Sequence, residues 1–186
     1  YTHHSVCALK GSSVTLGCRY SSRSFFRKSF SRVFWSKAVF TLKEPPDLSA
    51  DPQYIGRVQY LKNNPQDCTL RLSNLTDQDS SKYYATGVTS QGEVIQGSGG
   101  VNLSVTDLQV EMIPSMVEEQ DLVTLTCKTS CIFSDSPTFT WYKNDLELDS
   151  ISENLILWSV TQQDAGKYSC SVKGESVRSP HIALFV

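Results

Sequence analysis

The chain has 186 residues, of which 39% are hydrophobic, and it contains six cysteines. This length allows one or two domains, and this number of cysteines suits an oxidising compartment outside the cytosol. No apolar run approaches the ~20 residues that a membrane-spanning helix needs, and no leader-like segment opens the chain. We therefore expect the extracellular part of a plasma-membrane protein, with its anchor outside this sequence.

The net charge of −2 conceals an uneven distribution. Residues 1–106 carry 12 Lys and Arg against 7 Asp and Glu, a net charge of +5, whereas residues 107–186 carry 5 against 12, a net charge of −7. A basic first half attracts anionic partners over long range. The alternative is a chance spread of charge over solvated loops.

The first half of the chain has the pattern of a β-sandwich. Residues 14–18 alternate apolar and polar side chains, as a half-buried strand does, and end at Cys18. Trp35 follows, and then come the apolar residues Leu70, Leu72 and Leu75. The stretch 79–85 then resembles the strand that carries the tyrosine corner of an immunoglobulin sandwich, with Tyr83 as the corner.

The second half repeats this order. Residues 123–127 alternate and end in a cysteine, Trp141 follows, and residues 164–170 carry the full corner motif, with Tyr168 two residues before Cys170. Cysteine, tryptophan and tyrosine corner in the same order, twice, predict an all-β chain of two tandem immunoglobulin-like β-sandwiches.

The two predicted domains, residues 1–106 and 107–186, differ in type. Fifty residues separate Trp35 from Ala85, which leaves room for the extra C′ and C″ strands of a variable-type domain. The shorter second domain fits a C2 or I type. Glycines in residues 97–100 predict a bulge in strand G, and the absence of a Gly/Ser or Pro-rich spacer near residue 107 predicts a stiff junction.

The cysteines are distributed three to each domain. Ala85 occupies the strand-F position of the usual second core cysteine, and Cys68 in the predicted strand E shares inward parity with its apolar neighbours. The core disulfide of the first domain is therefore expected within one sheet, between strands B and E. The predicted pairs are Cys18–Cys68, Cys127–Cys170 and Cys7–Cys131. For Cys7 and Cys131 the alternatives are pairing with another chain or a free thiol.

Residues 58–60 and 67–72, together with these cysteines, resemble the siglecs, the sialic-acid-binding immunoglobulin-like lectins, and most closely their B-cell receptor type. The resemblance implies a variable-type first domain with a B–E disulfide, a constant-type second domain and a disulfide between the two. It also implies a cell-surface immune receptor.

The resemblance fails at one position. Siglecs hold the sialic acid carboxylate with an arginine on strand F, and Thr86 stands at the matching position here. A hydroxyl supplies neither the charge nor the bidentate geometry of a guanidinium. The sequence therefore predicts weak or no sialic acid binding through this strand.

The segment 19–32, after the predicted strand B, is rich in basic and aromatic residues and has no acidic residue. Loops at this end of a variable-type domain commonly carry recognition. The candidate ligand-binding residues in it are Arg23, Phe25, Phe26, Arg27, Lys28 and Arg32. The alternative is that the phenylalanines pack under the loop and the cations are merely solvated.

Strand F supplies further candidates. Tyr84, Thr86 and Val88 should point outward if Tyr83 and Ala85 point inward. An exposed sheet face with aromatic and apolar residues suggests contact with a protein partner. The alternative is ordinary pairing between neighbouring strands. We take Tyr84 and Thr86 as the candidate ligand-binding residues of this face.

The sequons at Asn74 and Asn102 predict N-glycosylation. No nucleophile–base pair, metal-ligand spacing or phosphate-binding loop stands out, so we expect neither catalysis, nor a cofactor, nor nucleic acid binding. The leading function is recognition of a cell-surface protein or an anionic glycan through the first domain. The alternatives are anionic phospholipid binding through segment 19–32 and homophilic adhesion of the basic first domain to an acidic second domain.

Overall fold

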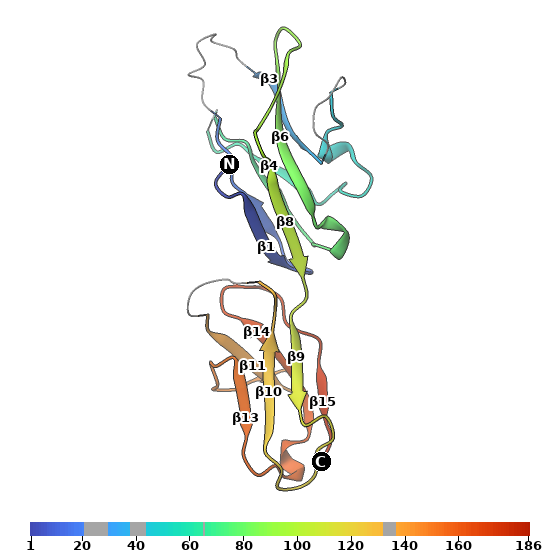
Figure 1. Cartoon of the computed structure of the whole chain (residues 1–186), viewed down its shortest axis with the longest axis vertical. Helices are drawn as coiled ribbons and strands as arrows, with labels where there is room; N and C mark the ends of the chain where they lie inside the picture. Colours follow the sequence, from blue (N-terminus) through green and yellow to red (C-terminus); the bar gives the residue numbers. More distant parts are fainter. Residues whose placement is uncertain (21–29, 38–43, 65, 132–136) are drawn as a thin grey trace. The chain divides into compact units, whose positions relative to one another are not determined.

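A computed structural model describes residues 1–20, 30–37, 44–64, 66–131 and 137–186. The chain divides into two compact units, Tyr1–Val105 and Thr106–Val186 (Figure 1). Within the described residues the regular structure consists of β-strands and three short 3-10 turns. No helix in this part of the chain is long and apolar enough to cross a membrane.

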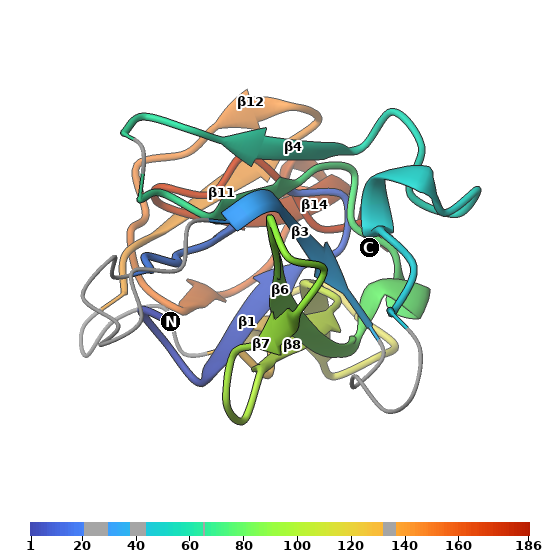
Figure 2. The same cartoon turned by 90° about the horizontal axis from the view of Figure 1, so that it is seen from above.

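The first unit contains two sheets. Its elements are β1 (Ser5–Leu9), β2 (Val14–Leu16), β3 (Phe30–Ser36), η1 (Leu48–Ala50), β4 (Val58–Leu61), β5 (Thr69–Leu72), η2 (Asp77–Asp79), β6 (Ser81–Thr89), β7 (Val94–Gln96) and β8 (Val101–Thr106). One sheet has the order β1-β8-β6-β3, with β7 also paired to β6, and the other has the order β2-β5-β4. Seen end-on, β4 lies in a different layer from β3, β6 and β8 (Figure 2).

The core between these sheets follows the sequence pattern. Val14, Leu16 and Cys18 are buried, as are Leu70 and Leu72 on the paired strand. Since strand side chains alternate between faces, these inward residues leave their polar neighbours in solvent. The predicted strands B and E of the first domain are confirmed.

Strand G of the first unit is interrupted, as the glycines predicted. The segments β7 and β8 both pair with β6, and residues 97–100 separate them. Gly99 and Gly100 have φ of 78° and 64°, the left-handed region that glycine enters at low cost.

The expectation of extra strands between β3 and β4 is not met by the described residues. Positions 44–57 form η1 and turns instead of a strand. Tyr54 from this stretch is buried in the core, and η1 lies against β3. Buried side chains attach this stretch to the core, whereas a strand would be held by backbone hydrogen bonds to its neighbour. Residues 38–43 lie outside the described part.

The tyrosine corner is present in the first unit and extended by an ion pair. The Tyr83 hydroxyl donates to the carbonyl of Asp79 at 2.6 Å and lies 3.0 Å from the hydroxyl of Tyr54. The Asp79 carboxylate accepts from the Arg57 guanidinium at 2.7 and 3.0 Å. Both oxygens of a nearly fully buried carboxylate are thus matched by the guanidinium fork, which is the geometry that makes a buried charge tolerable.

The second unit is a smaller sandwich. Its elements are β9 (Gln109–Ile113), β10 (Val123–Lys128), β11 (Phe139–Lys143), β12 (Leu146–Glu147), β13 (Asn154–Leu157), η3 (Gln162–Asp164), β14 (Gly166–Val172) and β15 (Ile182–Leu184). The sheets have the orders β13-β10-β9 and β12-β11-β14-β15. The Tyr168 hydroxyl donates to the carbonyl of Asp164 at 2.5 Å, so the second corner is also formed.

The core disulfides distinguish the two units. Cys18 and Cys68 flank the paired strands β2 and β5 of one sheet, and their Cα atoms lie 4.9 Å apart. Cys127 and Cys170 join β10 to β14, which belong to different sheets, with Cα atoms 6.1 Å apart. Both predicted core pairs are confirmed.

Cys7 and Cys131 are also disulfide-bonded, and no cysteine of the described residues is a free thiol. The free-thiol alternative is therefore excluded for both residues. The chain as a whole is two tandem immunoglobulin-like β-sandwiches.

Candidate recognition surface on the first unit

Three strands of the first unit form the sheet face on which the sequence placed its candidate residues. In β6, Tyr84 pairs with Ser36 of β3, and Thr86 pairs with Phe34 of β3 and with Gln96 of β7. Residues that face one another across an antiparallel pair share one side of the sheet, so these five side chains belong to the same face.

Thr86 is not exposed on this face, contrary to the prediction. Its side chain is 1% accessible, because the longer side chains of Phe34 and Gln96 flank it on the neighbouring strands. The Gln96 amide donates to the Thr86 hydroxyl at 3.1 Å, and the Ser36 hydroxyl lies 3.5 Å away. Thr86 is therefore a structural residue of the face and offers no contact to a ligand from solvent.

Tyr84 is half-buried and leans toward the start of β8. A Cβ on Gly100 would come within 2.8 Å of its ring, so the glycine makes room for the tyrosine. The Lys82 ammonium lies 6.0 Å from the centre of the same ring, at the outer limit of a cation–π contact. Part of the Tyr84 ring remains available to a partner.

Arg32 is exposed on β3 and already has a partner. Its guanidinium forms an ion pair with Glu44 and lies 4.9 Å from the centre of the Phe34 ring. The sequence segment 19–32 has no acidic residue of its own, but the fold places Glu44, which follows β3 in the chain, next to Arg32. Arg32 therefore contributes less free positive charge than its sequence neighbourhood suggested.

The remaining candidates of the basic segment, Arg23, Phe25, Phe26, Arg27 and Lys28, lie outside the described residues. The structure describes Tyr20 and Phe30, the two residues that flank positions 21–29. Tyr20 and Phe30 form an edge-to-face aromatic pair, with ring centroids 5.3 Å apart. Such pairs stabilise by ~0.5–1.5 kcal/mol beyond the burial of their area. The segment thus starts and ends at one aromatic anchor.

A cleft of about 410 Å³ opens next to this anchor, and the sequence did not predict it. Its walls include the disulfide between Cys18 and Cys68, Ala85 of β6, and Ile95 of β7. The one sequence signal for it was the alanine at the usual cysteine position. Because both sulfur atoms belong to one sheet, no covalent bridge crosses the gap between the sheets here.

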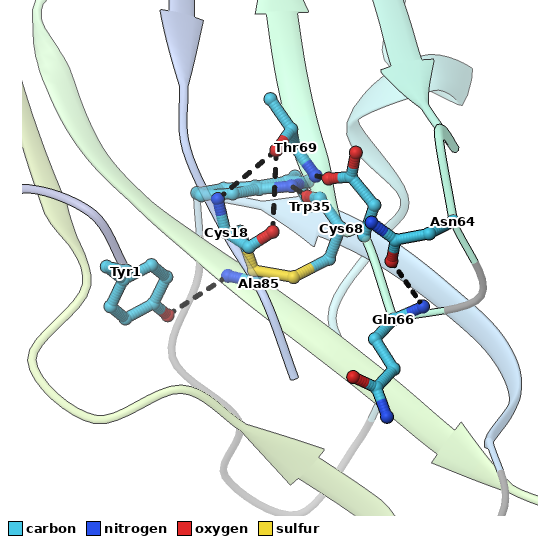
Figure 3. Close-up of a disulfide and its surroundings, with 9 residues drawn as sticks. Tyr1, Cys18, Trp35, Asn64, Gln66, Cys68, Thr69 and Ala85 are labelled. Atoms are coloured by element: carbon cyan, nitrogen blue, oxygen red, sulfur yellow. Dashed lines mark hydrogen bonds between the residues drawn. A yellow bond between two sulfur atoms is a disulfide. The ribbon is translucent and has the colours of Figure 1, made fainter. Parts of the chain in front are cut away.

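Tyr1 forms another wall of the cleft. Its ring lies beside the disulfide, 5.8 Å from the Trp35 ring, and its hydroxyl accepts a hydrogen bond from the amide of Ala85 at 3.2 Å (Figure 3). Burial raises the pKa of this hydroxyl, which is therefore neutral at physiological pH.

The two glycosylation candidates lie in the first unit. Asn74 lies in the turn between β5 and η2 and has φ of 51°, and Asn102 lies in β8. Both side chains are exposed. Among the described residues no cluster of three or more His, Cys, Asp and Glu side chains could hold a metal ion.

Comparison with known proteins supports the fold of the second unit directly. Residues 105–173 match the family profile described as an immunoglobulin domain. The chain is 26% identical over 198 aligned residues to Protein turtle homolog B of Rattus norvegicus, and 25% identical to that of Homo sapiens. These alignments cover 96% of the chain but only 13% and 12% of the two relatives, so the chain spans about an eighth of their length.

Two solved structures match most of the chain, each with a TM-score below 0.5. Murine CEACAM1b is 19% identical, with 96% of this chain and 94% of that chain covered and a TM-score of 0.38. The N-terminal four Ig domains of Dscam1 isoform 4.44 are 22% identical, with 97% and 42% covered and a TM-score of 0.36. The matched profile describes immunoglobulin domains in general and does not single out sialic-acid-binding lectins.

Proposed function

We propose that this chain is part of the extracellular region of a cell-surface recognition protein, and that its first unit binds a protein or an anionic glycan. The proposal is carried by the anchored basic segment. Five basic residues and three phenylalanines lie in the segment Arg19 to Arg32, and Tyr20 and Phe30, which flank residues 21–29, form an aromatic pair.

Charge and aromatic content suit this role. Cations in a surface segment attract carboxylate, sulfate and phosphate groups over about 8 Å at physiological ionic strength, and aromatic side chains add contact area. Tyr84, half-buried on the neighbouring sheet face, extends the candidate surface. Arg32 belongs to the candidate surface as a member of its ion pair with Glu44, and not as an unpaired cation.

The test removes two charges from the basic segment and two from elsewhere. The variant Arg27→Ser/Lys28→Ser and the control Lys10→Ser/Arg71→Ser each lose two cations. Lys10 and Arg71 are exposed residues of the same unit, and Lys10 forms an exposed ion pair with Asp77. The control should fold, because exposed substitutions usually change stability by about 0.5 kcal/mol or less. A circular dichroism spectrum checks the fold of both variants.

Each protein is applied to an array of sulfated and sialylated glycans and to cultured cells, at low and at high salt. We expect the first variant to lose binding, the control to retain it, and salt to weaken the wild type. Equal binding by both variants with no response to salt would remove the basic segment from the proposal. Binding to phosphatidylserine vesicles alone would favour the lipid alternative, and self-association alone would favour homophilic adhesion.

A further inference from the structure

The cleft beside the Cys18–Cys68 disulfide has the size and walls of a small-molecule site. Its volume of about 410 Å³ falls within the ~300–1,000 Å³ that is usual for ligand pockets. It exists because Ala85 carries only a methyl group where a cysteine would otherwise bridge to the opposite sheet. The disulfide lies along one wall instead and leaves the space open.

The walls are mainly apolar. Aromatic rings come from Tyr1, Tyr20 and Phe30, and aliphatic groups come from Val33 and Ile95. Such a lining favours a ligand that removes apolar surface from water, at about 25 cal/mol per Å².

Two glycines shape these walls. A Cβ on Gly87 would collide with the ring of Phe30, and one on Gly97 would collide with the hydroxyl end of Tyr1. The backbone of β6 and of the segment after β7 thus admits both rings to the cleft, and any larger residue at either position would displace a wall.

The polar side chains of the lining differ in whether they are paired with one another or exposed to solvent. Thr86 and Gln96 satisfy each other by the 3.1 Å hydrogen bond. Two exposed lining residues, His4 and Arg19, carry or can carry positive charge, and the described lining contains no carboxylate. The nearby Asp67 interacts with Arg19, but its carboxylate also accepts from the amides of Thr69 and Asn63.

We propose that this cleft binds a single-chain anionic amphiphile with the chemistry of a fatty acid. The hydrocarbon chain occupies the apolar cleft, and the carboxylate lies at Arg19, with His4 close to it. The site shares Arg19, Tyr20 and Phe30 with the basic segment of the proposed recognition function, so different variants test the two proposals: Arg27→Ser/Lys28→Ser for recognition and Ile95→Asn for the cleft.

The probe is dodecanoate, titrated into the whole chain and followed by calorimetry. The variant Ile95→Asn places an amide on the cleft wall, and Ile156→Asn in the second unit is the matched control. Both residues are strand isoleucines, with exposed fractions of 40% and 44%. We expect Ile95→Asn to weaken dodecanoate binding about tenfold, since it replaces apolar contact, and the control to leave it unchanged.

A second pair of variants tests the head group. Arg19→Gln should weaken dodecanoate about fivefold and leave dodecanol binding unchanged, because only the acid carries a charge. Arg71→Gln, an exposed residue of β5, is the control for net charge. In nuclear magnetic resonance spectra of the unmodified chain, dodecanoate should shift the amides of Ala85, Ile95 and Gly97.

The proposal is overturned if dodecanoate shows no saturable binding, or if Ile95→Asn and Ile156→Asn bind it equally. It is also overturned if Arg19→Gln weakens dodecanol as much as dodecanoate, or if the shifted amides lie outside the cleft. The spectra of the unmodified chain decide the question even if a variant fails to fold.

Discussion

The hydroxyl of Tyr1 accepts a hydrogen bond from the backbone amide of Ala85, with oxygen and nitrogen 3.2 Å apart. Ala85 stands where an immunoglobulin sandwich usually has the second cysteine of its core bridge. The segment before β1 thus supplies one wall of the cleft beside the relocated disulfide, and the Tyr1 ring packs near Trp35. A non-covalent contact thus joins residues 84 positions apart in the chain.

Removing this hydroxyl should destabilise the first unit. In Tyr1→Phe the ring remains, but the partly buried Ala85 amide loses its acceptor, and the loss of such a hydrogen bond costs about 1 kcal/mol. The control Tyr84→Phe removes a hydroxyl on the adjacent strand position that faces the outer side of the sheet, and it should change stability by less than about 0.5 kcal/mol. Denaturant unfolding of both variants measures the difference, and equal stability would show that the hydrogen bond contributes nothing.

Acid should weaken the first unit through Asp79. Burial by itself raises the pKa of this carboxyl, but the hydrogen bonds from Arg57 and from the Thr76 amide outweigh burial and hold the pKa below its ordinary value. A depressed carboxyl pKa stabilises the fold above the unfolded value of about 3.9, and this contribution is lost as the pH falls through the folded pKa. Thermal unfolding between neutral pH and acid should show this loss.

The variant Asp79→Asn isolates the effect. It leaves Arg57 without its charge partner, which should cost about 3 kcal/mol at neutral pH, and it should flatten the acid limb of the stability curve. Asp164→Asn is the natural control, because Asp164 occupies the same place before the second tyrosine corner and the described ion pairs give it no arginine. A wild-type acid limb that persists in Asp79→Asn would assign the acid sensitivity to another group.

We predict that Cys7 and Cys131 form a disulfide with each other. Both are oxidised, and the other four cysteines are paired within their own units. Mass spectrometry of a non-reduced digest should therefore yield one peptide that joins Cys7 to Cys131. A covalent dimer on a non-reducing gel, or a peptide that joins either cysteine to its own copy in another chain, would contradict the prediction.

Sialic acid should not bind through β6. Thr86 is buried and is held by Gln96 and Ser36, so it presents neither charge nor an accessible hydroxyl to a carboxylate. Titration of sialyllactose should therefore give the same result, weak or no binding through this strand, for the wild type and for Thr86→Ala. An affinity that falls in Thr86→Ala would refute this prediction.

Chain secreted from eukaryotic cells should carry glycans at Asn74 and Asn102, because both side chains are exposed within sequons. Mass spectrometry should show the loss of one glycan in Asn74→Gln and of one in Asn102→Gln. A site that stays unmodified in the wild type would show that exposure of its asparagine is insufficient there.

The sequence alone determined those features that depend on local periodicity. The alternation that ends in Cys18, the inward parity of Cys68 and the corner at Tyr83 are properties of single strands, whose side chains alternate between two faces. They were sufficient for the two sandwiches and for the disulfide within one sheet of the first. The same reasoning failed for Thr86, because parity gives the side of a sheet and not what the neighbouring strands place over it.

Only the tertiary structure decided the contacts between distant segments. Glu44 pairs with Arg32, Tyr1 contacts Ala85, and the cleft lies where Tyr1, Ala85 and the displaced disulfide meet. No local pattern encodes such contacts, because they depend on how the sheets pack and on which side chains fill the space between them. The sequence named the strands and their inward faces, and packing decided which residues remain accessible to a ligand.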